Sequence, residues 1–359
     1  MSDKKASSKS IFSKYLTVGN LIKIPAAVGT LRGLWDAVNW SAAETDVRNE
    51  LRQKIAIVGA PNSGKSTLFN TLQGKYRSPV SEKSGSTTDS VVTSFGMFTL
   101  VDTPGHKKQI QLDEVKQAVA ALFVLDGSHP ITETEIELFA ALQDIGKPVI
   151  IALNKCDLPA YSEELRQSAV AALNMRHIIA VSALRGDHVL DDLIPAIIEI
   201  SPDAALLIGK AAPVYRSDAA KRIIRNSALI TLTAGLEPIP LVDIPIILSA
   251  QIRMVLRIAA LFGDPISSEN AKELITAIAG SLLIRYLAEE TAKAAPFGGD
   301  LISGAMAAAG TWSIGMAALA YFENDKKLQT SQLQALYKNL LASFRSLQNP
   351  KEAIDRLSK

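Results

Sequence analysis

Hydrophobic positions change their spacing along this chain, and the changes divide the sequence into segments. Between residues 54 and 200, short apolar runs alternate with stretches in which apolar residues recur at helical spacing. The apolar runs predict strands at 54–58, 90–95, 97–101, 120–125, 148–153 and 177–182. The other stretches predict helices at 65–73, 107–118, 132–145, 162–174 and 189–200. Strands separated by helices predict an α/β domain over 54–202, with a doubly wound, mostly parallel six-stranded sheet.

A helical pattern dominates the second half, where we expect an apolar all-α domain over residues 215–325. Its stretch 301–322 has 22 residues without a charge, bounded by Asp300 and Glu323, which is long enough to cross a bilayer. The same stretch is rich in Ala, Gly and Ser, a composition that also suits a closely packed core helix. The helical domain could therefore be integral to a membrane, peripheral to it, or soluble. We expect it to associate with a membrane, in one of the first two ways.

The two ends of the chain are amphipathic. Residues 1–53 are expected to be a basic arm, because six basic residues and no acidic one lie between Lys4 and Arg32. An apolar stripe around Trp35 would lie in a membrane interface or pack on the rest of the protein. Residues 41–53 are charged and look like a connector. Residues 326–359 predict a final amphipathic helix that folds back on the helical domain or forms a homodimer. We expect a linker at 203–214.

Composition narrows the class of protein. The chain has 359 residues and a formal net charge of only +2, so no direct DNA binding is expected. Its one cysteine, Cys156, excludes an intramolecular disulfide and fits a reducing compartment.

One segment carries a specific chemical signal. Residues 59–66 read Gly-Ala-Pro-Asn-Ser-Gly-Lys-Ser, directly after a predicted strand and before a predicted helix. In this context glycines let successive backbone N–H groups converge on a phosphate, and the helix N-terminus adds partial positive charge. Lys65 would contact the β- and γ-phosphates, and the Ser66 hydroxyl would ligate Mg²⁺. The chain is therefore expected to bind a nucleotide.

Polar residues also follow other predicted strands, at the sheet edge where ligands of such domains bind. They are Asp102-Thr103-Pro104-Gly105-His106, Asn154-Lys155-Cys156-Asp157 and Ser182-Ala183-Leu184, with Gly85-Ser86-Thr87-Thr88-Asp89 in an earlier loop. A carboxylate at Asp157 can accept hydrogen bonds from guanine N1–H and the 2-amino group, which adenine lacks. The expected ligand is thus GTP or GDP.

This set of motifs resembles the small GTPases of the translation-factor and Ras-like superfamily, most closely the bacterial Era/TrmE-type branch. The resemblance covers roughly residues 54–200 and implies a Ras-like P-loop GTPase domain that hydrolyses GTP. It implies that Asn154 braces the guanine loop and contacts the base edge, that Lys155 lies along the purine, and that the Ala183 N–H meets O6. The implied nucleotide-binding residues are Asn62, Ser63, Gly64, Lys65, Ser66, Thr67, Gly105, Asn154, Lys155, Asp157, Ser182, Ala183 and Leu184.

The resemblance also implies metal ligands and catalytic groups. Ser66, Thr87 and Asp102 would hold Mg²⁺, with Thr88 as the alternative to Thr87. Lys65, Thr87 and His106 are the catalytic candidates. His106 would orient the attacking water, or be a surface histidine without a catalytic part. Asn62 matches an asparagine that helps to hold K⁺ in potassium-activated relatives.

The helical half looks like the domain of unknown function found in YcjF-type bacterial membrane proteins. The likeness rests on residues 239–245 and 295–300, with the Ala/Gly-rich stretch after them. Together these features predict a GTP-hydrolysing switch at the cytoplasmic face of a membrane, or in the cytoplasm if the helical domain is soluble. The alternatives are a GTPase for ribosome or RNA maturation, a dynamin-like membrane remodeller, and a nearly inactive GTP-binding scaffold.

Overall fold

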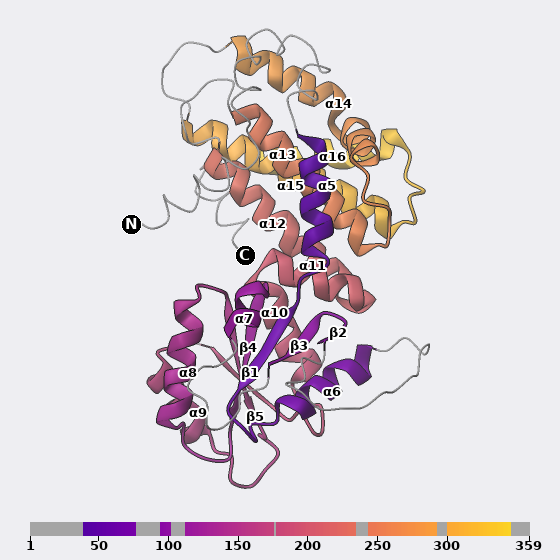
Figure 1. Ribbon diagram of the computed structural model, residues 1–359. Coiled ribbons are helices and arrows are strands. Elements are labelled where there is room, and N and C mark those ends of the chain that lie inside the picture. The colour runs from indigo at the N-terminus through magenta and orange to yellow at the C-terminus, as the bar shows by residue number, and fades with distance from the viewer. Residues whose placement is uncertain are drawn as a thin grey trace. The chain divides into compact units, whose positions relative to one another are not determined.

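The computed structural model describes residues 39–76, 94–101, 112–175, 177–234, 243–292 and 300–345. The chain forms two compact units (Figure 1). The α/β unit contains Leu51–Ala219, and the helical unit contains Met1–Glu50 together with Ala220–Lys359. The helical unit is therefore assembled from both sides of the inserted α/β unit.

The first unit is built on a six-stranded sheet with the order β2-β3-β1-β4-β5-β6. Its strands are β1 Ile55–Gly59, β2 Ser94–Phe95, β3 Phe98–Leu100, β4 Ala120–Asp126, β5 Val149–Asn154 and β6 Ile178–Val181. Only β2 runs antiparallel to its neighbour, β3, and the other pairs are parallel. The predicted doubly wound, mostly parallel sheet is thus confirmed.

Helices cover this sheet, and Figure 1 shows α8 and α9 together on one side of it. The described helices are α6 Lys65–Tyr76, α7 Leu112–Gln117, α8 Glu133–Asp144, α9 Glu163–Leu173, the π-helix η1 Val189–Leu193, α10 Ile194–Ile200, α11 Pro202–Ala211 and the 3₁₀-helix η2 Pro213–Tyr215. The main core lies between the strands and α7, α8 and α9. In it, the rings of Phe123 from β4 and Phe139 from α8 stack with centroids 5.8 Å apart.

Local sequence signals start and stop these helices. Thr132 and Glu135 form a capping box at the start of α8, because each side chain accepts the other residue's backbone N–H. The Ser162 hydroxyl accepts the N–H of Leu165 at the start of α9, and Asn174 ends that helix in the left-handed conformation.

The predicted linker at 203–214 is wrong, because most of this segment is helical. Ser201 caps α11 by accepting the Ala204 N–H at 3.0 Å, and Pro202 occupies the first helical turn. The Tyr215 hydroxyl then donates to the carbonyl of Leu190 at 2.7 Å, which holds η2 against the same unit. Proline is typical of linkers but also favours the first helical position, and here it begins a helix.

The helical unit contains α5 Trp40–Glu50, most of α12 Arg216–Ala234, α13 Asp243–Leu261, α14 Ser268–Ala292, α15 Asp300–Glu323 and α16 Thr330–Arg345. Figure 1 shows α5, in indigo, among the orange and yellow helices from the other end of the chain. It packs against α13 and α14. The expected connector at 41–53 is therefore largely a helix of this unit, and the rest of the predicted arm, up to residue 38, lies outside the described residues.

Charged groups hold α5 in place. Glu50 is buried and forms ion pairs with Arg253 and with Arg257, whose Nε lies 2.7 Å from Glu50 Oε2. Glu44 accepts the Ser268 N–H, the first of α14, at 2.6 Å. Burial alone would raise the pKa of Glu44, but its hydrogen bonds with Ser268 and the nearby charge of Arg48 outweigh this and lower the pKa. The acidic residues Glu44 and Glu50, which in the sequence look typical of a solvated connector, therefore form tertiary contacts.

The apolar stretch 301–322 lies within α15. Among the described residues, Gly304–Glu323 is the one segment long and apolar enough to cross a membrane, and 61% of an 18-residue stretch within it is buried inside the protein. A Cβ added at Gly315 would lie 2.7 Å from Ile224 of α12 and 2.9 Å from Met254 of α13, whereas one at Gly310 would meet only Tyr337 of α16, at 3.8 Å. Helix α15 is therefore packed by its own unit on several sides.

The predicted C-terminal amphipathic helix forms as α16 and folds back on α14 and α15. Its apolar stripe supplies the buried residues Leu333, Tyr337, Leu341 and Phe344, and Leu336 and Leu340 are partly buried. Leu347 lies outside the described residues. The apolar face of α16 is used within the unit, as the fold-back interpretation requires.

Candidate nucleotide-binding site

The predicted phosphate-binding segment is the turn between β1, which ends at Gly59, and α6, which begins at Lys65. Asn62 and Gly64 have φ angles of 64° and 91°, so the backbone curls through the left-handed region twice within three residues. The Lys65 side chain is buried, and its Nζ donates to the carbonyl of Ala60 at 2.9 Å. The ammonium group thus lies against the backbone of the predicted phosphate-binding loop.

This loop fits a phosphate group on two structural grounds. Its backbone enters the first turn of α6, where helix N–H groups point out of the helix end. Gly64 lies so close to the neighbouring loop that an added Cβ would be 2.1 Å from Asn154 Nδ2. Ser66 and Thr67 follow with exposed side chains at the start of α6. The loop is therefore a tight backbone cradle whose outer rim carries hydroxyl groups.

Asn154 connects this cradle to the predicted guanine loop, by which we mean residues 154–157 and 182–184. It ends β5, and its Nδ2 donates to the carbonyl of Ser63 at 2.9 Å. Its Oδ1 accepts the N–H of Ala183 at 2.9 Å, and the residue is only 2% exposed. Asn154 therefore joins the phosphate loop to the backbone of Ala183. The Ala183 N–H already donates to Asn154, so it could reach guanine O6 only as a second, bifurcated acceptor. Because Asn154 is almost fully buried, it has little surface left to contact the base edge.

The remaining guanine-loop residues surround this bridge. Asp157 has a side chain that is 7% exposed, and its Oδ2 lies 3.6 Å from Nε of Arg185. Ser182 is fully buried, and its hydroxyl accepts the N–H of Arg185 at 3.1 Å, while Leu184 is 79% exposed. Sequence reasoning missed Arg185, which is a neighbour of the Asp157 carboxylate that was predicted to select the base.

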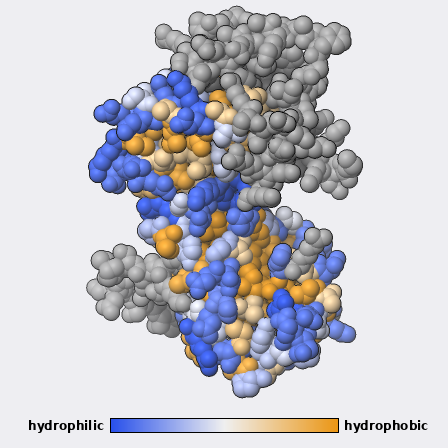
Figure 2. Space-filling view, turned by 180° about the vertical axis from the view of Figure 1, so that it is seen from behind, coloured by the Kyte–Doolittle hydropathy of each residue, from blue (hydrophilic) through white to orange (hydrophobic). Residues whose placement is uncertain are grey.

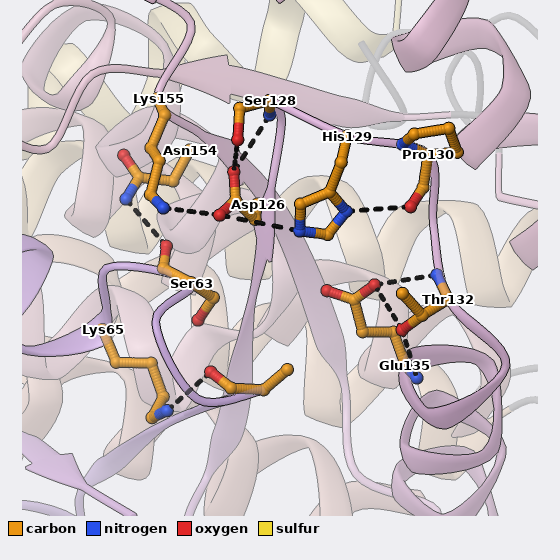
Figure 3. Close-up of polar contacts among 11 residues, drawn as sticks. Ser63, Lys65, Asp126, Ser128, His129, Pro130, Thr132, Glu135, Asn154 and Lys155 are labelled. Carbon is orange, nitrogen blue, oxygen red and sulfur yellow. Dashed lines mark hydrogen bonds and ion pairs between the residues drawn. The ribbon is translucent and has the colours of Figure 1, made fainter.

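A second missed residue, Asp126, ends β4 beside Asn154 (Figure 3). Its Oδ1 accepts both the N–H and the hydroxyl of Ser128, at 2.9 and 2.6 Å, and its Oδ2 lies 2.5 Å from Nζ of Lys155. Burial alone would raise the pKa of Asp126, but the hydrogen bonds from Lys155 and Ser128 prevail and lower the pKa. The signal that found the other loops, a polar residue directly after an apolar strand, was present here too.

Cys156 takes no visible part in the site. Burial, followed by the nearby charges of Asp157 and Asp187, raises the pKa of its thiol. A neutral thiol is a poor nucleophile and a poor metal ligand, in keeping with a variable position within the motif.

Several predicted residues lie outside the described residues. They are Gly85, Thr87, Thr88, Asp89, Asp102, Gly105 and His106. Of the three expected Mg²⁺ ligands, the structure describes only Ser66, at the exposed start of α6. Within the described ranges, no group of three or more His, Cys, Asp or Glu residues could hold a metal ion. The phosphate cradle and the guanine loop are therefore the parts of the site that the structure brings together.

Comparison with known proteins agrees with this geometry. A family profile described as a 50S ribosome-binding GTPase matches residues 54–155, and one described as a domain of unknown function (DUF697) matches residues 210–346. The chain is similar to GTPase Der of Syntrophotalea carbinolica, with 34% identity over 199 residues that cover 51% of this chain and 45% of the relative. GTPase Der of Xylella fastidiosa strain M23 is 29% identical over 210 residues, which cover 50% and 45% of the two chains.

The chain spans about half the length of these curated relatives, since the match covers 45% of each. Among solved structures it is similar to a probable GTP-binding protein engB, with 20% identity, 38% of this chain and 93% of that chain covered, and a TM-score of 0.29. The chain therefore joins a segment that matches a GTPase family profile to a helical segment that matches a domain of unknown function.

Proposed function

We propose that the protein is a GTP-dependent switch of the Era/TrmE type, in which the helical unit is the output. The observation that carries the proposal is the Asn154 bridge, which makes the phosphate cradle and the guanine loop one continuous site. A ligand that contacts both loops gains from their preorganisation. The Gly-x-Pro-Asn-x-Gly-Lys-Ser and Asp-Thr-Pro-Gly motifs support the Era/TrmE assignment.

In this proposal the protein's residues divide the work by position. Lys65 leaves the Ala60 carbonyl to contact the β- and γ-phosphates, and Ser66 joins Thr87 and Asp102 in holding Mg²⁺. That ion, when bound, supplies neutralisation of the charge on the phosphate oxygens. Gly105 contacts the γ-phosphate, so hydrolysis releases the segment that follows it.

The covalent route from site to helical unit is short. Helix α5 ends at Glu50, and β1 begins at Ile55 and leads directly into the phosphate loop. Because α5 is anchored by Glu50 in the helical unit, four residues separate that anchor from the first strand of the GTPase domain. Movement of β1 during the nucleotide cycle would therefore act on a fixed helix, which supports the helical unit as the output.

Hydrolysis is tested by single-turnover kinetics of the full-length protein and two variants. Lys65→Ala is expected to lose GTP binding, because the loop loses its cation. His106→Ala is expected to bind GTP normally and to hydrolyse it about 100-fold more slowly, the scale of a lost general acid–base or water-orienting group. Unchanged turnover by His106→Ala would remove His106 from the mechanism and return it to the surface-histidine interpretation.

Potassium activation is a separate part of the proposal. Asn62 is exposed and has the positive φ that directs it away from a regular helical turn, which leaves its side chain available to a cation near the phosphates. Turnover should rise when K⁺ replaces Na⁺ at equal ionic strength. Equal turnover in the two salts would end this part of the proposal.

Action at the cytoplasmic face of a membrane is also proposed, with peripheral docking favoured over a lone span. The length and composition of Gly304–Glu323 and the basic residues before Arg32 support a membrane, while the packing of α15 inside its unit argues against a lone span. Figure 2 shows hydrophobic residues of the helical unit on this face, next to hydrophilic ones. Protein that resists alkaline carbonate extraction would be integral, protein that it releases would be peripheral, and protein never found in the pellet would refute membrane action.

The rival function is ribosome maturation, which is favoured by the profile described as a 50S ribosome-binding GTPase. Sedimentation of cell extract with a non-hydrolysable GTP analogue separates the two. Co-migration with the large ribosomal subunit would support the rival, and absence from ribosomal fractions would support the membrane switch. A dynamin-like remodeller would instead form oligomers with GTP on vesicles. No homodimer through α16 is proposed, because its apolar face is buried in its own unit.

A further inference from the structure

The Asp126 carboxylate occupies a position that no motif of the site assigns. Its backbone is fixed because β4 pairs in register with β5, with Asp126 opposite Asn154, and because the Gly127 N–H donates to the Asn154 carbonyl at 2.7 Å. Its side chain is only 10% exposed, and Ser128 holds Oδ1 with two hydrogen bonds. The second oxygen therefore points in one direction, toward the guanine loop.

Lys155 donates a hydrogen bond to that oxygen. Its Nζ lies 2.5 Å from Asp126 Oδ2, and its backbone has a φ of 68°, a conformation that a non-glycine residue adopts only when its surroundings hold it there. The Nε2 atom of His129 lies 3.6 Å from the same Oδ2 (Figure 3). Lys155 is thus restrained both at its backbone and at the end of its side chain.

This restraint has a consequence for nucleotide binding. Lys155 stands between Asn154, which braces the phosphate loop, and Asp157, the base-selecting carboxylate two positions later. An unrestrained lysine side chain loses rotamer freedom when a ligand orders it, and this loss weakens binding. Holding the ammonium on Asp126 orders the aliphatic stem before the purine arrives and removes part of that cost.

We infer that Asp126 is a positioning residue of the guanine-nucleotide site, which acts by holding Lys155 across the loop so that its aliphatic stem forms a preformed wall for the purine. The inference rests on the proposed guanine site. It requires that Asp126 affects nucleotide affinity and that it does so only through Lys155. The γ-phosphate chemistry takes place at the other end of the nucleotide and should not depend on it.

The test is the affinity of the full-length protein for a fluorescent GDP and a fluorescent GTP. Asp126→Asn keeps the size of the side chain but removes its charge, and it should weaken both nucleotides about 10-fold through faster dissociation. The rate of hydrolysis at saturating GTP should be unchanged. The matched control is Glu163→Gln, which removes a carboxylate from an ion pair with Arg166 on exposed α9 and should bind like the wild type.

A double-mutant cycle separates positioning from general destabilisation. In a Lys155→Ala background, Asp126→Asn should cause no further loss of affinity. Ser128→Ala leaves the charge of Asp126 but loosens its carboxylate, so it should weaken binding to a smaller degree. This variant also keeps the test decisive if Asp126→Asn does not fold.

Each outcome bears on a different statement. Wild-type affinity in both Asp126→Asn and Ser128→Ala, or an equal loss in the presence and absence of Lys155, would overturn the inference alone. Failure of the wild-type protein to bind GDP or GTP would overturn the guanine site as well. A 10-fold loss that disappears in the Lys155→Ala background supports it.

Discussion

Replacing Glu50 with glutamine should unfold the helical unit at a markedly lower concentration of urea. The side chains of Glu50 and Arg257 are 7% and 6% exposed, and Arg253 contacts the same carboxylate. Taking the charge from one partner of a buried ion pair costs about 3–5 kcal/mol, because the other charge stays buried. With a urea dependence of about 2 kcal/mol per molar, the midpoint should fall by about 2 M.

Tryptophan fluorescence isolates this effect. Two of the chain's three tryptophans lie in described helices of the helical unit, Trp40 in α5 and Trp312 in α15, so changes in their emission follow the unfolding of this unit. The matched control is Asp325→Asn, which changes a carboxylate that is 82% exposed and paired with Lys327 in the same unit. It should shift stability by less than about 1 kcal/mol. Equal midpoints for the two variants would refute the reasoning that Glu50 anchors α5.

The other predictions concern backbone fit and pH. Gly64→Ala should weaken GTP binding about 100-fold in a fluorescence titration, because the added methyl group strains the backbone at a positive φ and collides with the guanine loop. The control is Gly146→Ala, which has a similar φ of 72° but open space around it and should bind GTP normally. Gly310→Ala should stabilise the helical unit by about 0.5–1 kcal/mol, and Gly315→Ala should destabilise it by about 1–3 kcal/mol in urea titrations. Equal effects of the two would mean that α15 is not packed in this bundle. The pKa of Glu44 is lowered in the folded protein, so its stabilisation is present above the ordinary value of 4.5 and is lost as pH falls through the folded value. Below pH 4.5 the wild type should therefore lose stability more steeply than Glu44→Gln.

Local signals made the GTPase domain readable from its sequence. Strands such as β4 and β5 are buried along nearly their whole length, so they appear as continuous apolar runs. The phosphate loop carries its own turn chemistry in Gly64 and Lys65, and the polar loops follow the strands that position them. Each of these features depends on residues that are close together in the sequence.

Long-range contacts were not readable in this way. Glu50 lies 203 and 207 residues before the two arginines that it pairs with, and nothing within residues 41–53 indicates such partners. The same holds for α15, whose composition suits both a bilayer and a core. The close approach of Gly315 in α15 to Ile224 in α12 and Met254 in α13 favours the core helix over the bilayer. Sequence patterns identified these elements, but only the tertiary structure shows what covers them.

The most direct test of the guanine site is a titration of the full-length protein with fluorescent GDP, ADP and XDP, repeated with Asp157→Asn. The wild type should prefer GDP over ADP by at least about 100-fold, because only guanine offers two donors to the Asp157 carboxylate. An asparagine amide can accept from N1–H and donate to the 2-oxo group of xanthine, so the variant should lose GDP and gain XDP. Similar affinity of the wild type for GDP and ADP, or an unchanged preference in Asp157→Asn, would contradict a guanine site built around the Asn154 bridge.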